Sequence, residues 1–76
     1  MGQSEALLFA AFGRAAAQRI DEFDAQGLAN TAWAFARMRY VDAPLFAALA
    51  RVAVQRISTF NAQNLSNIAW AFATVG

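Results

Sequence analysis

The sequence predicts an all-α protein whose four antiparallel helices form two helix-turn-helix hairpins. Alanine, the strongest helix former, supplies much of a hydrophobic content of 59%, and the β-branched runs that strands prefer are lacking. The chain also repeats itself, because residues 6–39 and 43–76 agree at about 20 of 34 positions with a fixed offset of 37 residues. We therefore expect one repeat unit over residues 1–42 and a second over residues 43–76, joined as one continuous segment.

The first helix is expected from about Glu5 to Ile20, with Ser4 as its N-cap. Its helical periodicity places Phe9 and Ile20 at the edge of an inner face that consists of Leu8, Phe12, Ala15, Ala16 and Arg19. The connection that follows, residues 21–23, is of the length that joins antiparallel helices.

The second helix is expected from Ala25 to Arg37, with Asp24 as its N-cap. Phe23 stands just before the cap, where an apolar side chain can pack against the fourth residue of the helix, Leu28. The apolar stripe that should face the core consists of Leu28, Ala32, Phe35 and Ala36.

The third helix is expected from Ala43 to Ile57, after the N-cap Asp42. Pro44 fits its first turn, where the missing N–H donor would be unpaired anyway.

The fourth helix is expected from Ala62 to Val75, with Asn61 as its N-cap. Phe60 repeats the position of Phe23 and should pack against Leu65. Helical repeats normally need three or more units to bury their apolar faces, and two are present here. We therefore expect this segment to be part of a longer array or of a larger assembly.

The composition argues against an enzyme. Cysteine and histidine are absent, and the five acidic residues show no repeated spacing, so we expect no catalytic site, no metal and no cofactor.

Arginines interrupt each apolar stretch before it reaches the roughly 18 residues of a membrane span. A net charge of +1 is too small to indicate nucleic-acid binding by itself. No targeting peptide is expected in this chain.

The most conserved block between the two units runs from Leu28 to Ala36 and returns from Leu65 to Ala73. This Leu-x-Asn-x-x-Trp-Ala-Phe-Ala pattern, with its 37-residue period, resembles octotricopeptide repeats and the related heptatricopeptide repeats that accompany RAP domains. The resemblance implies an α-solenoid that binds single-stranded RNA in a mitochondrion or a chloroplast.

A candidate RNA-binding face lies opposite the Leu28 stripe, where glutamine and asparagine could hydrogen-bond base edges. Arg37 and Arg39 follow this face and are the best phosphate ligands, because the second unit has no counterpart of either. Together with neighbouring positions at which the units differ, the candidates are Gln26, Gly27, Asn30, Thr31, Arg37, Arg39, Gln63, Asn64, Asn67, Ile68 and Thr74.

Structural roles compete with recognition at several positions. Asn30 and Asn67 could instead bond backbone groups between stacked helices, and Trp33 and Trp70 are expected to pack between the hairpins rather than stack on bases. The arginines at the ends of the first and third helices, Arg19 and Arg56, are expected to bond the carbonyl groups at the end of their own helix, with phosphate binding as the alternative.

Two functions follow from these observations. The first is a non-catalytic module that binds single-stranded RNA through phosphates and bases. The alternative is a structural subunit that docks on neighbouring repeats or on protein subunits of a large organellar complex, such as a ribosome or a photosynthetic or respiratory assembly. The high apolar content and near-zero net charge favour this alternative.

Overall fold

The computed structural model describes residues 3–75, and these form helices without any strand. The order is α1 (Gln3–Gln18), α2 (Ala25–Arg37), α3 (Ala43–Gln55) and α4 (Ala62–Val75), with the short 3-10 helices η1 (Ile20–Glu22) and η2 (Ile57–Thr59) inside the two hairpins. The predicted all-α class is confirmed.

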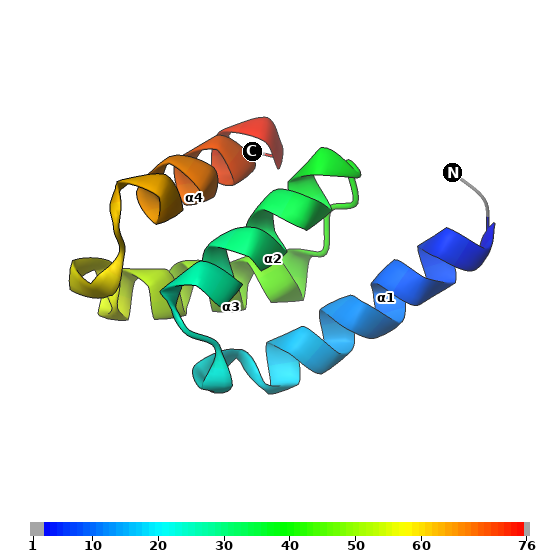
Figure 1. Cartoon of the computed structure of the whole chain (residues 1–76). Helices are drawn as coiled ribbons and strands as arrows, with labels where there is room; N and C mark the ends of the chain where they lie inside the picture. Colours follow the sequence, from blue (N-terminus) through cyan, green and yellow to red (C-terminus); the bar gives the residue numbers. More distant parts are fainter. Residues whose placement is uncertain (1–2, 76) are drawn as a thin grey trace.

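The two hairpins lie next to each other in the same orientation. Figure 1 shows α1 running antiparallel to α2 and α3 running antiparallel to α4, with α2 and α4 side by side in the same direction. Of all helix pairs, α2 and α4 share the most extensive contact. The second hairpin is therefore a shifted copy of the first, as the sequence repeat predicts.

The N-caps of three helices follow the prediction. Asp24 Oδ1 accepts from the Gly27 N–H at 2.7 Å, and Asp42 Oδ1 accepts from the Leu45 N–H at 3.0 Å. In α4, Asn61 caps the first turn from the position expected for it. Each cap satisfies one of the N–H groups that a helix leaves unpaired at its start, and is worth about 1 kcal/mol.

The predicted bounds of α1 and α3 are wrong in part. Ser4 lies inside the first turn of α1 and is not its N-cap. Both helices end two residues earlier than expected, because the next backbone N–H bonds two carbonyl groups at once and tightens the chain into a 3-10 turn. In α1 the Arg19 N–H is shared between Ala15 and Ala16, and Arg56 repeats this arrangement at the end of α3.

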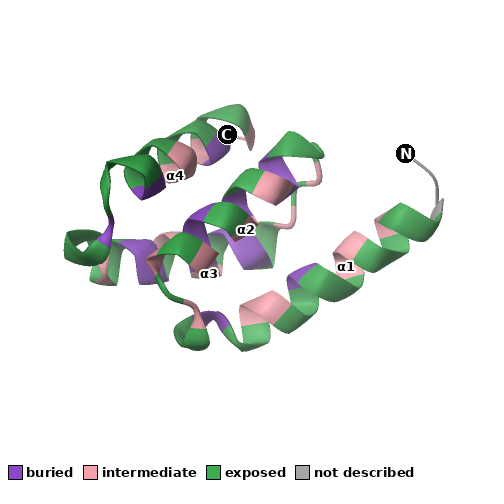
Figure 2. Cartoon of the chain, viewed as in Figure 1, coloured by how far each residue is buried: buried purple, intermediate pink, exposed green. Residues whose placement is uncertain are grey.

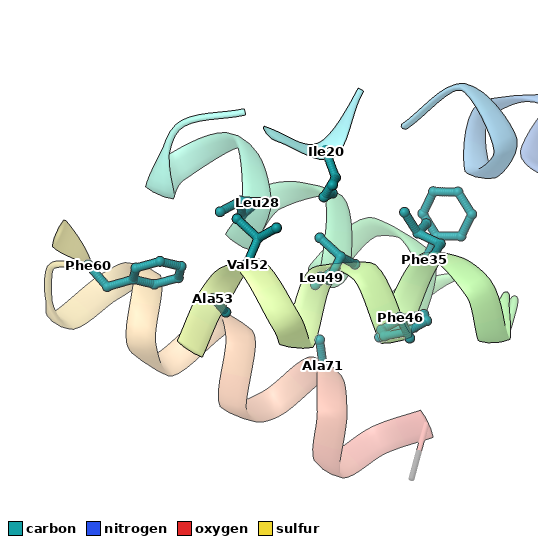
Figure 3. Close-up of a cluster of buried hydrophobic side chains, with 12 residues drawn as sticks. Ile20, Leu28, Phe35, Phe46, Leu49, Val52, Ala53, Phe60 and Ala71 are labelled. Carbon is teal, nitrogen blue, oxygen red and sulfur yellow. The ribbon is translucent and has the colours of Figure 1, made fainter. Parts of the chain in front are cut away.

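The core lies between the two hairpins, as Figures 2 and 3 show. The predicted stripe of α2 is buried, and α3 contributes the largest further group of buried side chains. The fully buried large residues are Leu28, Leu45, Leu49 and Val52. Each such aliphatic side chain contributes about 1.5–3 kcal/mol through burial.

The predicted inner face of α1 is wrong at two large residues. Leu8 is 50% and Phe12 is 52% exposed, whereas Phe9 packs against the core and Ile20 is almost fully buried. The helix is apolar on two sides, so its periodicity allowed either side to face inward. Contacts with the rings of Phe35 and Tyr40 turn the side that carries Phe9 inward.

One aromatic contact holds the two helices of each hairpin together. The rings of Phe9 and Phe35 meet edge to face with centroids 5.1 Å apart, and their repeat counterparts Phe46 and Phe72 do so at 5.3 Å. Such pairs contribute about 0.5–1.5 kcal/mol beyond their burial. The same ring contact thus recurs at the equivalent position of both units.

The last helix departs from this regularity. Leu65 is 42% exposed, although its counterpart Leu28 is completely buried. The expected packing of Phe60 therefore leaves Leu65 partly open. Leu28 is covered by the second hairpin, whereas within residues 3–75 no further helix covers the equivalent face of α4.

Candidate nucleic-acid interface

An exposed row of side chains runs along the outer surface of α2. Gln26, Asn30, Trp33 and Arg37 follow one another at helical spacing, and all four are exposed. In α4 the equivalent row is Gln63, Asn67, Trp70 and Thr74. Because α2 and α4 lie side by side, these two rows form one surface, which we name the amide–tryptophan face.

The two tryptophans form the centre of this face. Their ring centroids lie 6.3 Å apart with the planes inclined by 37°, so the predicted packing between hairpins is confirmed. Trp33 nevertheless remains 42% and Trp70 44% exposed. An aromatic ring that is held by a neighbour and still open to solvent is the kind of platform on which nucleic-acid bases stack.

The sequence-based candidates did not include the tryptophans. A signal was present, because Trp33 follows Gln26 by seven residues and precedes Arg37 by four, which places it in the same helical row. The tryptophans were left out because they were expected to pack between the hairpins. In the structure the two rings pack against each other and remain partly exposed.

Amide groups flank the tryptophans. Gln63 Nε2 donates a hydrogen bond to Asn67 Oδ1 at 3.3 Å, so the Asn67 side chain is bonded to a neighbouring side chain along its own helix. Asn30 is exposed at the edge of a groove between α1 and α2. Both asparagines therefore lie one turn from a tryptophan, with amide groups that can bond base edges.

Asn64 does not belong to the face. It is only 7% exposed, and its Oδ1 accepts from the Asn61 N–H at 3.2 Å while Asn61 Oδ1 accepts from the Asn64 N–H at 2.7 Å. This reciprocal arrangement is a capping box built from two asparagines. The amide of Asn64 stabilises the start of α4 and is removed from recognition.

Three other candidates also lie off the face. Ile68 packs against the core, Gly27 donates its N–H to the Asp24 cap, and Thr31 is half-buried along the groove. One step along a helix turns a side chain by about 100°, so Ile68 points toward the first hairpin and Thr31 into the groove between α1 and α2.

Arg37 and Arg39 lie at the C-terminal end of α2, and both are exposed. Arg39 has a positive φ of 58°, in the left-handed region that glycine normally occupies after a helix. The backbone there forms a Schellman motif, in which the N–H of Tyr40 bonds Phe35 at 2.9 Å and the N–H of Arg39 bonds Ala36 at 3.0 Å. The two arginines give this end of the face its positive charge.

Arg56 has a different role from the one expected. Its guanidinium group donates to the carbonyl oxygens of Phe23 and Asp21 in the first hairpin, rather than to the end of its own helix. Arg19 instead lies 3.8 Å from Glu22, with both side chains largely exposed. Such an exposed ion pair contributes at most about 1 kcal/mol.

A second feature is an apolar groove of about 470 Å³ between α1 and α2. Its walls include Phe12, Ala15, Phe23 and Ala34, and Arg19 lies at its edge. Elsewhere in residues 3–75 the acidic side chains form no group that could hold a metal ion. Among the described helices, none is both long and apolar enough to cross a membrane.

No curated protein and no solved structure matches this chain. A family model does match, over residues 3–76, and it describes the RNA-editing substrate-binding complex 6 protein. The assignment to octotricopeptide or heptatricopeptide repeats is therefore wrong. The residues that suggested it include Leu28, Ala32 and Phe35, which are buried packing positions that any helical repeat of similar length can share.

The location in a mitochondrion or chloroplast followed from that resemblance alone and stays an untested prediction. The family match covers nearly the whole chain, and the family is named for a complex that binds RNA-editing substrates. The chain belongs to the RNA-editing substrate-binding complex 6 protein family.

Proposed function

We propose that this chain is a non-catalytic helical module that holds single-stranded RNA on its amide–tryptophan face. The observation that carries the proposal is the pair formed by Trp33 and Trp70, whose rings are fixed against each other and remain more than two-fifths exposed. Stacking of a base on an aromatic ring contributes about 1–3 kcal/mol and tolerates any base. A module with two such rings suits an RNA whose sequence varies.

The polar groups around the tryptophans support the same function. Asn30 and Asn67 can hydrogen-bond base edges beside a stacked ring, and Arg37 and Arg39 can bind phosphates at one end of the face. Double-stranded RNA does not present its bases for stacking, so the face favours single strands.

The family name supports a role in RNA metabolism within a protein complex. It gives no support to a ribosome or to a photosynthetic or respiratory assembly as the host. The complex for which the family is named binds RNA-editing substrates, and an RNA-holding module is consistent with such a complex.

The test uses the intrinsic fluorescence of the chain, which contains two tryptophans, both on the proposed face. Unlabelled single-stranded RNA of mixed sequence should quench this fluorescence, and double-stranded RNA of the same length should quench it far less. An abasic strand with the same phosphates separates stacking from charge. Binding that leaves the tryptophan emission unchanged would rule out the proposed face.

A variant series completes the test. Replacing Trp33 by alanine should weaken RNA binding by about tenfold, in line with the loss of one stacked base. Val54→Ala is the control, because Val54 is a large exposed hydrophobic residue of α3 that is not part of the amide–tryptophan face. Equal losses in the two variants would contradict the proposal.

A further inference from the structure

Three repeat positions differ sharply in burial between the two units. In α3 they are completely buried under the first hairpin, whereas their counterparts in α1 are exposed. The positions are Leu45, Leu49 and Val52 in α3, and Leu8, Phe12 and Ala15 in α1. Because the Phe9–Phe35 contact of the first hairpin recurs as Phe46–Phe72 in the second, we take α1 to present an uncovered copy of the surface that α3 presents to the first hairpin. We name this surface the head.

The opposite end of the molecule shows the converse difference. The α2 stripe is buried by the second hairpin, and its α4 copy is largely open. Leu65 is 42% exposed where Leu28 is completely buried, and Ile57 is 51% exposed where Ile20 is 2% exposed. The α4 copy consists of Leu65, Ala69, Phe72 and Ala73. With Ile57 it forms a second surface, which we name the tail.

The apolar groove coincides with the head. Its lining residues Phe12, Ala15, Phe23 and Ala34 have as counterparts Leu49, Val52, Phe60 and Ala71. All four counterparts lie in the core, where the first hairpin packs over the second (Figure 3). The groove is therefore the open equivalent of a space that is filled inside the molecule.

A polar contact gives the head and tail a second, independent match. Arg56 reaches from the second hairpin to carbonyl groups of residues 21 and 23 in the first. Its counterpart Arg19 lies at the edge of the groove with an exposed side chain, and the counterparts of the two acceptor residues are Ser58 and Phe60, close in sequence to Ile57 of the tail. A unit seated in the groove would bring these carbonyl groups to Arg19.

We propose that the groove between α1 and α2 receives the α4 face of a second copy of this chain, so that copies stack head to tail. The proposed occupant is inferred from the contact inside the molecule. There the helix face of α2 with the pattern Leu-x-x-x-Ala-x-x-Phe-Ala packs on the second hairpin. The chain carries this face twice, on α2 where it is already buried and on α4 where it is open. The proposal is independent of RNA binding.

Such a contact joins two different surfaces and leaves one of each free at the ends. Association of this kind is open-ended rather than limited to dimers. The average mass of the whole chain in analytical ultracentrifugation should therefore rise steadily with protein concentration.

Two variants, each with either the head or the tail blocked, should replace open-ended association by a complex of defined size. Leu8→Glu places a charge on the head and leaves the tail intact, and Leu65→Glu does the reverse. Burying an unpaired carboxylate is costly, so each variant alone should associate at least about tenfold more weakly than the unmodified chain. Mixed in equal amounts, the two variants should form a one-to-one dimer and nothing larger.

Matched controls lie beside each blocked position. Leu7→Glu adds the same charge next to Leu8, but Leu7 is 71% exposed and its counterpart Pro44 is exposed too, so it lies outside the contact. Gln63→Glu is the corresponding control for the tail. Both controls should associate like the unmodified chain, and circular dichroism verifies that all variants stay helical.

Three outcomes would overturn the proposal. The first is an unmodified chain that stays monomeric at every concentration, and the second is a mixture of the blocked variants that yields no dimer. The third is association of the Leu8→Glu and Leu65→Glu variants at the strength of the controls, which would place the contact elsewhere. Arg19→Ala adds a separate readout, because it should weaken stacking without lowering the stability of the monomer.

Discussion

Arg56 donates a hydrogen bond through Nη1 to the carbonyl oxygen of Phe23, a residue 33 positions earlier in the chain. A second bond runs from Nη2 to the Asp21 carbonyl oxygen at 2.7 Å. One planar guanidinium group thus satisfies two carbonyl groups of the first hairpin from the end of α3. Since α3 belongs to the second unit, the contact joins the two halves of the repeat.

Replacing Arg56 by alanine should lower the free energy of unfolding by about 1.5–3 kcal/mol, the range for hydrogen bonds that involve a charged group. Urea denaturation followed by circular dichroism measures this. Lysine at the same position should recover only part of the loss, because a single ammonium group cannot reproduce the planar fork. Arg19→Ala is the control at the equivalent position, and a loss as large as that of Arg56→Ala would refute the assigned role.

Arg39→Gly should raise the stability of the chain by about 1 kcal/mol, because glycine adopts the positive φ of this position without steric cost. If Arg39 binds a phosphate, the same variant should bind RNA more weakly, and the slope of log affinity against log salt should fall by about 0.7. Arg37→Ala is the comparison, since it should reduce the salt slope without the gain in stability. A variant that is more stable and binds RNA as well as the original would exclude Arg39 from the interface.

Much of the fold could be predicted from the sequence because its signals are local. The bounds of α2 and α4, and the caps Asp24, Asp42 and Asn61, depend on residues within one turn of each helix. The inner face of α1 could not be predicted in the same way. Phe9 and Phe12 give equivalent apolar faces by periodicity, and the choice between them depends on tertiary contacts, which for Phe9 include Phe35 and Tyr40.

The candidate site was predicted in part for a related reason. Helical spacing identifies the exposed row from Gln26 to Arg37 without knowledge of its neighbours. Helical spacing does not show that Trp33 of the first hairpin contacts Trp70 of the second. It also does not show that the side chain of Asn64 is bonded within the N-terminal cap of α4. The exposure of a side chain in a repeat depends on whether another unit covers it. The sequence of a single unit does not contain that information.

The pair Leu49 and Phe12 tests this dependence directly, because the two residues occupy the same position of the repeat. Leu49 is completely buried and Phe12 is 52% exposed. Leu49→Ala should cost about 2–5 kcal/mol, whereas Phe12→Ala should cost about 1 kcal/mol or less in the monomer, although it removes the larger side chain. Thermal or urea denaturation at low protein concentration compares the two. Similar losses would mean that the groove beside Phe12 is already filled.

Gly13 and Asp42 should show strong energetic coupling. Gly13 is buried in α1, and a Cβ atom there would overlap Oδ2 of Asp42, whose other carboxylate oxygen caps α3. Alanine normally stabilises the interior of a helix by about 1 kcal/mol relative to glycine. Here the added methyl group would displace the Asp42 side chain, and loss of that N-cap costs about 1 kcal/mol. Gly13→Ala should therefore give no gain in the unmodified chain, and a loss if the Asp42 side chain cannot move aside.

The same substitution should become stabilising by about 0.5–1 kcal/mol once Asp42 has been replaced by alanine, because the obstruction is gone and the helix propensity remains. A double-mutant cycle from urea denaturation isolates this coupling, which should reach about 1 kcal/mol. Ala50→Gly provides the comparison at the equivalent position of α3, where the change should simply cost the difference in helix propensity. Additive effects of Gly13→Ala and Asp42→Ala would show that α1 does not approach the start of α3 as closely as the structure places it.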